Sequence, residues 1–180
     1  MIFATCGSSH LPFSRMMRAL EVLPAADLHV QYGPAAPPPC AWAETYLPFD
    51  AMVAKIAEAD VVVSHAGVGS LMCSLRAGHV PIIFPRLVRY AETVDDHQAE
   101  LAQALAERGT VMLAWTPEEL LDAIAIAPRR AATRVLSAER LSAAVRAAIH
   151  DEPVAAITRP PRPDRLLHRM RRTSPWLRRS

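Results

Sequence analysis

The chain has 180 residues, of which 51% are hydrophobic and 21% are charged. This composition predicts one globular domain with a short appendage and excludes a large multidomain enzyme, because domains mostly hold about 100–200 residues. The net charge of +2 is uneven: residues 1–158 carry 12 basic and 17 acidic side chains, whereas residues 159–180 carry eight Arg and one Asp. Such a basic segment is typical of proteins that meet a membrane surface, a nucleic acid or an acidic partner, and also of a solvated disordered tail.

The chain alternates short apolar runs of strand type with amphipathic patterns of helical type. This alternation predicts an α/β fold with a mainly parallel sheet and crossover helices. Strands are expected over Ile2–Cys6, Leu28–Tyr32, Ala41–Leu47, Val61–His65, Pro81–Phe84 and Val111–Ala114. Helices are expected over Phe13–Leu23, Phe49–Ala59, Leu71–Ala77, from Asp95 or Asp96 to about Arg108, after the cap Thr116, and over about Ser137–His150. The sequence therefore predicts a domain over residues 1–152 and a basic Pro/Arg-rich tail over residues 153–180.

The cysteines and the N-terminus indicate a reducing, cytoplasmic setting. Cys6, Cys40 and Cys73 lack any C-x-x-C spacing, so neither a disulfide framework nor a zinc ribbon is predicted. Met1 precedes an apolar segment without a basic stretch, which argues against a secretion signal. The longest stretches without Asp, Glu, Lys or Arg are interrupted by Pro, His, Gly or Ser and are shorter than the ~18 apolar residues that span a bilayer. No transmembrane segment is predicted.

Two loops rich in small residues follow predicted strands, at the edge of the sheet where open parallel sheets bind ligands. They are Thr5-Cys6-Gly7-Ser8-Ser9-His10 and His65-Ala66-Gly67-Val68-Gly69-Ser70. Free backbone N–H groups in the first loop and a helix N-terminus after the second favour an anionic diphosphate. Each loop alone is also what an ordinary tight strand-to-helix connection produces, so neither decides the function by itself.

Several better-known signatures are missing from the sequence. There is no G-x-x-x-x-G-K-[ST] motif, and Lys55 is the only lysine, so a P-loop ATPase is not indicated. The Gly67-Val68-Gly69 turn lacks the third glycine of the dinucleotide fingerprint, because residue 72 is Met. Asp95 and Asp96 are adjacent and do not form a D-x-D motif, so no metal site is predicted.

A third loop, over residues 85–98, gathers arginines, carboxylates, an imidazole and an amide before a predicted helix. Its polar residues include Arg86, Arg89, Glu92, Asp95, Asp96, His97 and Gln98. These groups suit an anionic ligand that carries many hydroxyls. The alternative is a solvated helix cap with surface ion pairs.

Taken together, these segments resemble the C-terminal domain of family 28 glycosyltransferases, and the small stand-alone Alg13-like and PssE-like subunits most of all. The resemblance covers about residues 1–125. It is carried by Thr5-Cys6-Gly7 with Pro12-Phe13, Ser64-His65-Ala66-Gly67-Val68-Gly69-Ser70, Ser74-Leu75-Arg76-Ala77-Gly78, Pro81-Ile82-Ile83-Phe84-Pro85-Arg86 and Val94-Asp95-Asp96-His97-Gln98. The H-A-G-x-G-S and D-D-H-Q elements together are far more specific than either glycine loop.

The resemblance implies one half of a GT-B architecture, a Rossmann-like domain with helices on both faces of the sheet. It implies the donor-binding subunit of a metal-independent glycosyltransferase without a further cofactor. Such an enzyme moves a hexose or N-acetylhexosamine from a UDP-sugar to a lipid-linked or polysaccharide acceptor, as in exopolysaccharide biosynthesis. A membrane-anchored chain of the Alg14 or PssD type would supply the acceptor site. Two alternatives stay open: a catalytically silent nucleotide-binding regulatory subunit, and a homo-oligomeric glycosyltransferase acting on a small acceptor.

The resemblance also implies residue roles. The expected donor-binding residues are Gly7, Ser8, Ser9, His65, Gly67, Val68, Gly69, Ser70, Arg86, Glu92, Asp96, His97 and Gln98. Among them, the glycines of the second loop and Ser70 would face the diphosphate, and His97 and Gln98 would contact the sugar hydroxyls. Apart from the resemblance, base choice is expected to depend on loop backbone contacts near Tyr46–Phe49, which no motif reveals. His65 is alternatively a hydrogen-bonded scaffold residue.

His10 is the local candidate for the general base, with a partner chain as the other source of the base and a helix cap as the other role of His10. The sequence departs from the family pattern at two positions. Cys73 stands where many relatives have an acidic residue that would bind ribose, and Ser9 stands where PssE-like relatives tend to have a histidine.

The basic tail gains a role from the resemblance. It interleaves its arginines with Leu166, Leu167, Met170, Trp176 and Leu177. This pattern suits peripheral attachment to anionic lipid on the inner face of the plasma membrane, or docking on a membrane-bound partner, with a disordered tail as the alternative. Nucleic-acid binding is not predicted, because Trp176 is the only aromatic residue among the basic ones and so offers little stacking surface.

Overall fold

The computed structural model of the chain describes residues 1–128. The expected helix over 137–150 and the basic tail lie outside these residues.

The centre of the fold is a six-stranded parallel sheet with the strand order β3-β2-β1-β4-β5-β6. The strands are β1 (Ile2–Thr5), β2 (Leu28–Gln31), β3 (Trp42–Glu44), β4 (Val61–Ser64), β5 (Ile82–Ile83) and β6 (Met112–Leu113). The order reverses direction between β1 and β4, as in doubly wound sheets, and ligands of such sheets bind outside the carboxyl ends of the strands at this reversal. The predicted Rossmann-like α/β class is confirmed.

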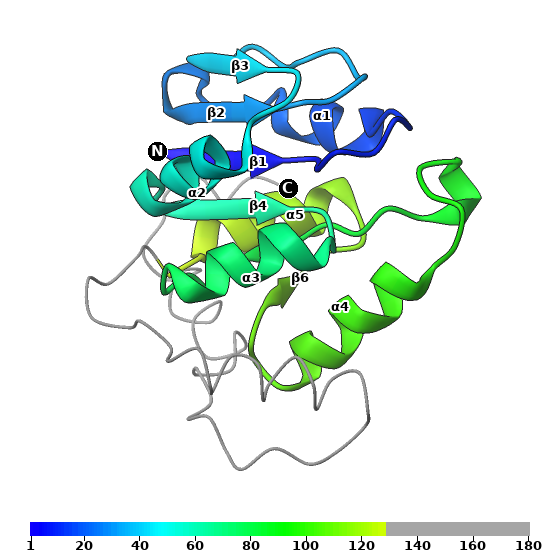
Figure 1. Cartoon of the computed structure of the whole chain (residues 1–180). Coiled ribbons are helices and arrows are strands. Elements are labelled where there is room, and N and C mark those ends of the chain that lie inside the picture. The colour runs from blue at the N-terminus through cyan, green and yellow to red at the C-terminus, as the bar shows by residue number, and fades with distance from the viewer. Residues whose placement is uncertain (129–180) are drawn as a thin grey trace, which may run out of the picture.

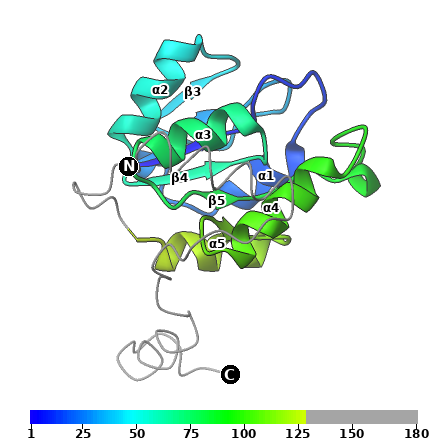
Figure 2. The ribbon, with the colours of Figure 1, turned by 60° about the horizontal axis from the view of Figure 1, so that its bottom comes forward.

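Helices cover both faces of the sheet (Figures 1 and 2). They are α1 (Ser14–Leu20), α2 (Phe49–Glu58), α3 (Val68–Arg76), α4 (His97–Glu107) and α5 (Pro117–Ile126), with 3-10 turns η1 (Ala25–Asp27) and η2 (Val88–Tyr90). Helices α1 and α5 pack together on one face, and their core includes Met16, Leu20 and Leu120. Helices α2, α3 and α4 cover the opposite face.

Successive side chains of a strand point to opposite faces of the sheet, so the same strands contribute to two hydrophobic cores. Ile2 and Ala4 of β1 point into the α1–α5 core, whereas Phe3 between them points into the core under α2. All four residues of β1 and of β4 are buried, as the run of valines predicted for a central strand. Each large apolar side chain buried in this way stabilises the fold by about 1.5–3 kcal/mol.

The ends of the helices agree with the predictions at one site and differ at another. Thr116 caps α5, because its Oγ1 accepts a hydrogen bond from the Glu119 N–H at 3.2 Å, as its spacing predicted. Helix α3 instead begins at Val68, three residues before the predicted start at Leu71. The first turn of a helix makes few internal hydrogen bonds, so Gly69 weakens it little there. The second glycine loop is therefore itself the start of a helix.

Candidate functional site

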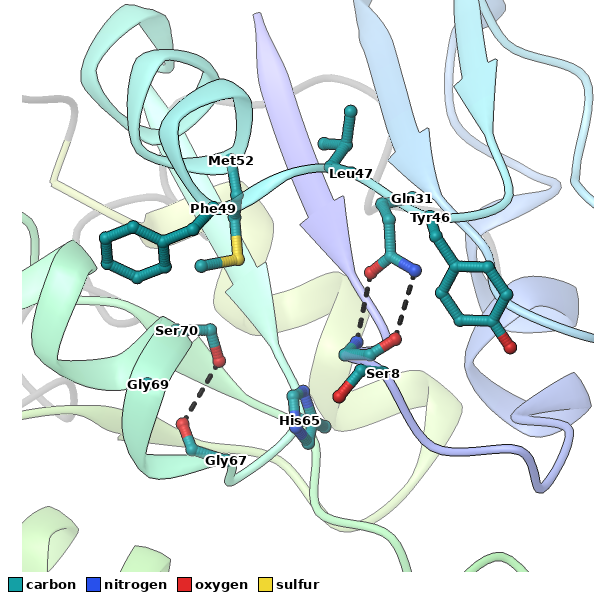
Figure 3. Close-up of a pocket in the computed structure, with 11 residues that line it drawn as sticks. Ser8, Gln31, Tyr46, Leu47, Phe49, Met52, His65, Gly67, Gly69 and Ser70 are labelled. Carbon is teal, nitrogen blue, oxygen red and sulfur yellow. Dashed lines mark hydrogen bonds between the residues drawn. The ribbon is translucent and has the colours of Figure 1, made fainter.

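A cavity of about 420 Å³ lies at the carboxyl ends of β1, β2 and β4 (Figure 3). Its walls come from the loop after β1, the loop between β3 and α2, and the first turn of α3. It is lined by Gly7, Ser8, Gln31, Tyr46, Leu47, Phe49, Met52, His65, Gly67, Gly69 and Ser70. This volume falls within the range of about 300–1,000 Å³ that is usual for small-molecule sites.

The cavity has an apolar side and a polar side. Tyr46 and Phe49 stand on the apolar side, and they are 49% and 62% exposed, so aromatic surface is available to a flat ligand. The polar side is formed by small residues and backbone groups at the ends of β1 and β4 (Figure 3). None of the described residues that line the cavity is Asp, Glu, Lys or Arg.

His65 lies between two glycines on the polar side of the cavity. A methyl group on either Gly7 or Gly67 would collide with the His65 ring. Gly7 has a φ of +75°, which favours glycine as well, whereas Gly67 has an ordinary φ of −71°. The absence of a side chain at residue 67 is therefore explained by the ring of His65 alone.

The imidazole of His65 is neutral at physiological pH. Burial lowers its pKa to about 4, with a further contribution from the positive charge of Arg86. Its Nδ1 atom is buried and has no hydrogen-bond partner among residues 1–128. The ring can therefore donate or accept a hydrogen bond at the cavity without carrying charge.

The first turn of α3 presents backbone N–H groups at the cavity. The first hydrogen bond within this helix runs from Leu71 N–H to the Gly67 carbonyl, so the N–H groups of Val68, Gly69 and Ser70 precede the internal bonding pattern. The positive end of the helix dipole lies at the same place. The Ser70 hydroxyl is held within the protein, 2.8 Å from Ser64 Oγ and 3.1 Å from the Gly67 carbonyl.

The loop after β1 was expected to offer free backbone N–H groups, and this expectation is wrong for Gly7. The Gly7 N–H is not free, because it donates to Gln31 Oε1 at 3.1 Å. Ser8 lines the cavity, whereas Ser9 does not, and Ser9 Oγ accepts from the Leu11 N–H at 3.2 Å. His10 is exposed and lies outside the cavity lining. It does not cap α1, whose N-cap residue is Phe13 without a side-chain hydrogen bond.

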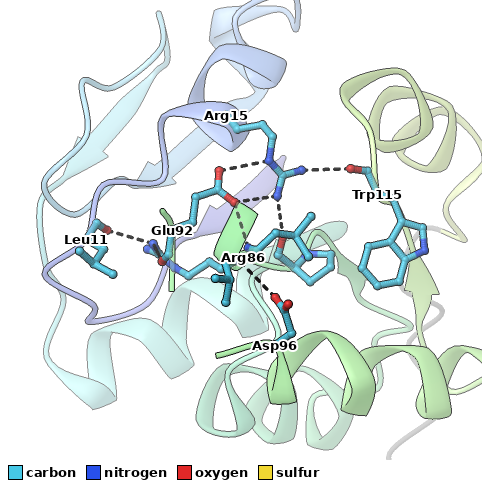
Figure 4. A network of polar contacts seen from close by, with 9 residues as sticks. Leu11, Arg15, Arg86, Glu92, Asp96 and Trp115 are labelled. Atoms are coloured by element: carbon cyan, nitrogen blue, oxygen red, sulfur yellow. Dashed lines mark hydrogen bonds and ion pairs between the residues drawn. The ribbon is translucent and has the colours of Figure 1, made fainter. Parts of the chain in front are cut away.

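Arg86 and Glu92 belong to a buried network beside the cavity (Figure 4). Arg86 is 2% exposed, and its guanidinium donates to the carbonyls of Cys6, Leu11 and Glu92 at 2.9 to 3.0 Å. Glu92 accepts two hydrogen bonds from Arg15, at 3.1 and 2.9 Å, and one from the Leu87 N–H. Both residues therefore hold loops of this chain together, and neither lines the cavity.

The D-D-H-Q element lies at the start of α4, outside the cavity lining. Asp96 Oδ1 accepts from the Val88 N–H at 3.1 Å, and Asp95 Oδ1 accepts from the His97 N–H at 3.2 Å. The His97 side chain is 82% exposed, 3.5 Å from Glu100. Gln98 is partly buried, with Oε1 unpaired among the described residues. A sugar contact by His97 and Gln98 stays a prediction.

Cys73 faces the core rather than the cavity. It packs beside Phe3, Ile56 and Val62 under α2 and α3, and burial raises the pKa of its thiol. The residue therefore acts as a small apolar side chain.

Sequence motifs identified about half of the residues that line the cavity. Six expected residues line it, namely Gly7, Ser8, His65, Gly67, Gly69 and Ser70, and the loop expected to contact a base supplies Tyr46, Leu47 and Phe49. Gln31 and Met52 were missed. A polar residue at the carboxyl end of a buried strand is a signal that could have found Gln31, whereas Met52 follows an ordinary helical pattern.

Among residues 1–128, no cluster of three or more His, Cys, Asp or Glu side chains is arranged to hold a metal ion. No helix in this part of the chain has the length and apolar character needed to cross a bilayer.

Comparison with known proteins identifies the family. Residues 1–151 match the model of the glycosyltransferase family 28 C-terminal domain. The chain belongs to this family. The family 28 resemblance drawn from the motifs is thereby confirmed, and with it the assignment of the fold to one half of a GT-B glycosyltransferase.

Curated relatives match only part of this family 28 chain. The UDP-N-acetylglucosamine transferase subunit ALG13 of Cryptococcus neoformans var. neoformans serotype D, in strains JEC21 and B-3501A, is 43% identical over 67 residues. That segment is 37% of this chain and 30% of the relative. The chain thus matches less than a third of the length of these relatives.

Two solved structures align with this chain at low sequence identity. The glycotransferase of kitacinnamycin aligns with 97% of this chain and 43% of its own, with a TM-score of 0.50 and 20% identity. MurG of Acinetobacter baumannii aligns with 96% of this chain and 49% of its own, with a TM-score of 0.48 and 20% identity.

Proposed function

We propose that the chain is the nucleotide-sugar-binding subunit of a glycosyltransferase. In this proposal it holds a UDP-sugar and releases a hexose or N-acetylhexosamine to a lipid-linked or polysaccharide acceptor. A second subunit, membrane-anchored and Alg14- or PssD-like, supplies the acceptor site. The chain then works in the cytoplasm as a peripheral component at the membrane, with no cofactor or metal.

The observation that carries the proposal is the coincidence of the family match with the cavity. The family model spans residues 1–151, and the 420 Å³ cavity lies within this range at the reversal of strand order. Its aromatic side suits a nucleobase, and its polar side offers the first turn of α3 to a diphosphate. The matched ALG13 segment belongs to a UDP-N-acetylglucosamine transferase subunit, which supports a UDP-sugar as the donor.

The chemistry assigned to this chain is stabilisation of the leaving group. As the bond between the anomeric carbon of the sugar and the diphosphate oxygen breaks, negative charge grows on the nucleotide diphosphate. The N–H groups of Val68, Gly69 and Ser70 and the dipole of α3 are placed to meet that charge. The neutral His65 ring adds a hydrogen bond. The acceptor hydroxyl needs a general base, and we assign that base to the second subunit, because His10 lies outside the cavity lining.

Calorimetry with UDP-N-acetylglucosamine on the full chain tests the proposal. We expect saturable binding, and we expect the double substitution His97→Ala with Gln98→Ala to weaken it about 10-fold or more while UDP binds as before, because these residues are proposed to contact only the sugar. Gln103→Ala is the matched control, since Gln103 is exposed on the same helix and its side chain donates to Glu107 at 2.9 Å, away from the cavity lining. A chain that binds neither UDP nor any UDP-sugar contradicts the proposal.

A further inference from the structure

The side-chain amide of Gln31 lines the cavity and is bonded there to the loop after β1 (Figure 3). It is also bonded to the loop before α2. Gln31 ends β2 and is 4% exposed. Its Oε1 accepts from Thr5 Oγ1 at 2.7 Å and from the Gly7 N–H at 3.1 Å. Its Nε2 donates to the Gly7 carbonyl at 3.0 Å and to the Thr45 carbonyl at 2.7 Å.

These four hydrogen bonds use both donor hydrogens and both lone pairs of the amide. A carboxamide has two donor hydrogens and an oxygen with two lone pairs, and each of them has a partner here. The pattern also fixes which end is oxygen, because the carbonyls of Gly7 and Thr45 can face only the NH₂ group and the Gly7 N–H can face only the oxygen. No other natural side chain of this length offers both kinds of group.

The two loops held by Gln31 form opposite sides of the cavity. Gly7 precedes Ser8 in the loop after β1, on the polar side, and it contacts His65. Thr45 directly precedes Tyr46 and Leu47, on the apolar side. The Thr45 carbonyl also accepts from the Gly33 N–H at 2.9 Å, so the backbone after β2 is bonded to the loop before α2. The amide therefore sets the separation of the two sides.

We propose that Gln31 is a positioning residue that couples the two ends of the nucleotide site, so that a ligand spanning both ends gains affinity that its separate parts do not have. This inference rests on the proposed function for the identity of the ligand. A nucleoside diphosphate reaches both sides of the cavity, whereas a nucleoside or pyrophosphate needs only one. Correct spacing matters only for the spanning ligand, since the binding of linked groups depends on the geometry between their sites.

The test compares UDP, uridine and inorganic pyrophosphate by calorimetry on the full chain. The main variant is Gln31→Glu, which has the same size but turns a carboxylate oxygen toward the carbonyls of Gly7 and Thr45. We expect it to bind UDP about 10-fold or more weakly and to bind uridine and pyrophosphate within about threefold of the original chain. Thr5→Val is a milder second variant, because it removes one donor to Gln31 Oε1 and a 3.3 Å acceptor of the Gly7 N–H but leaves the other three bonds of the Gln31 amide. It should show a smaller loss of the same kind.

A control separates positioning from a general loss of stability. Leu120→Val removes core volume under α5, and Leu120 does not line the cavity. It should lower the melting temperature and leave all three affinities unchanged. Equal affinity of UDP for the original chain and Gln31→Glu overturns the inference, and so does an equal loss for UDP and both fragments.

Amide hydrogen exchange in the free chain keeps this test distinct from that of the proposed function. The Gly7 and Gly33 N–H groups should be protected in the original chain and should exchange faster in Gln31→Glu, with unchanged protection in β4. If no nucleotide binds the original chain, the proposed function fails and exchange alone decides whether Gln31 couples the loops. Unchanged protection at both glycines overturns the coupling even if UDP binds.

Discussion

Two polar regions lie side by side at the carboxyl edge of the sheet, and they use their polar groups differently. The cavity is formed by neutral groups: small residues, backbone N–H groups, the amide of Gln31 and the uncharged ring of His65. The neighbouring network contains the charges of Arg15, Arg86 and Glu92, all committed to partners within the chain (Figure 4). The charged groups hold the loops in place, whereas the first N–H groups of α3 and the His65 ring remain available to a ligand.

The network still acts on the cavity through its electric field. The positive charge of Arg86 is the second cause, after burial, of the low pKa of His65. The same charge raises the potential near the loop after β1, because Arg86 donates to the Cys6 carbonyl at 2.9 Å. A phosphate in the cavity would thus meet a positive potential without forming a salt bridge, and buried fields of this kind are screened little by salt.

The largest expected effect comes from removing the charge that holds the network. We expect Arg86→Met to lower the free energy of unfolding by about 3–5 kcal/mol, because the carbonyls of Cys6, Leu11 and Glu92 would lose their donor while buried. Urea denaturation measures this change. Arg89→Met is the matched control, since Arg89 is exposed in the same loop, and its effect should stay within about 0.5 kcal/mol. Similar losses for the two variants would contradict the role of Arg86.

A smaller effect is expected from protonating His65. Its pKa is about 4 in the folded chain and about 6.5 when unfolded, so the unfolded state binds the extra proton between these values. The stability from this residue is therefore complete above pH 6.5 and is lost as the pH falls toward 4. Between pH 7.5 and 4.5 the loss should be about 2–3 kcal/mol. It is measured as the difference between the original chain and His65→Asn, in which the other titrating groups cancel. An identical pH dependence in both chains would show that His65 is not buried in the neutral form.

The fold was largely predictable because its signals are local. Apolar runs such as Val61–Val63 indicate buried strands, and the Thr116 cap with Pro117 indicates a helix start in any context. The start of α3 was placed three residues too late, because glycine propensity in isolation argues against a helix whose first turn in fact tolerates it.

The site was predictable only where small residues marked it. Glycines near His65 are a local sign of close packing, so the motif identified that side of the cavity. Arg86, Glu92 and Gln31 have partners 20 or more residues away in the sequence in at least one of their bonds, and no local pattern tells whether such a group meets a ligand or another loop. Arg86 and Glu92 were consequently predicted to bind the donor, and Gln31, whose amide is bonded to loops on both sides of the cavity, was missed.

The smallest effect is expected from alanine substitutions at two glycines, which together test the packing around His65. Gly67→Ala places a methyl group against the His65 ring and should destabilise the chain by about 1–3 kcal/mol, although the backbone of Gly67 is unstrained. Gly69→Ala has no atom within 4 Å of the new methyl group and lies in the first turn of α3, so it should leave stability unchanged or raise it by up to about 1 kcal/mol. Thermal melting of both variants measures the contrast.

A double substitution identifies the cause of that loss. If the ring is what Gly67→Ala meets, the substitution should be nearly neutral in a His65→Ala background, and the coupling between the two sites should recover about 1–3 kcal/mol. A loss that is the same in both backgrounds would place the strain in the backbone before α3 instead. In that case the glycine would serve the helix start and not the neutral ring at the cavity.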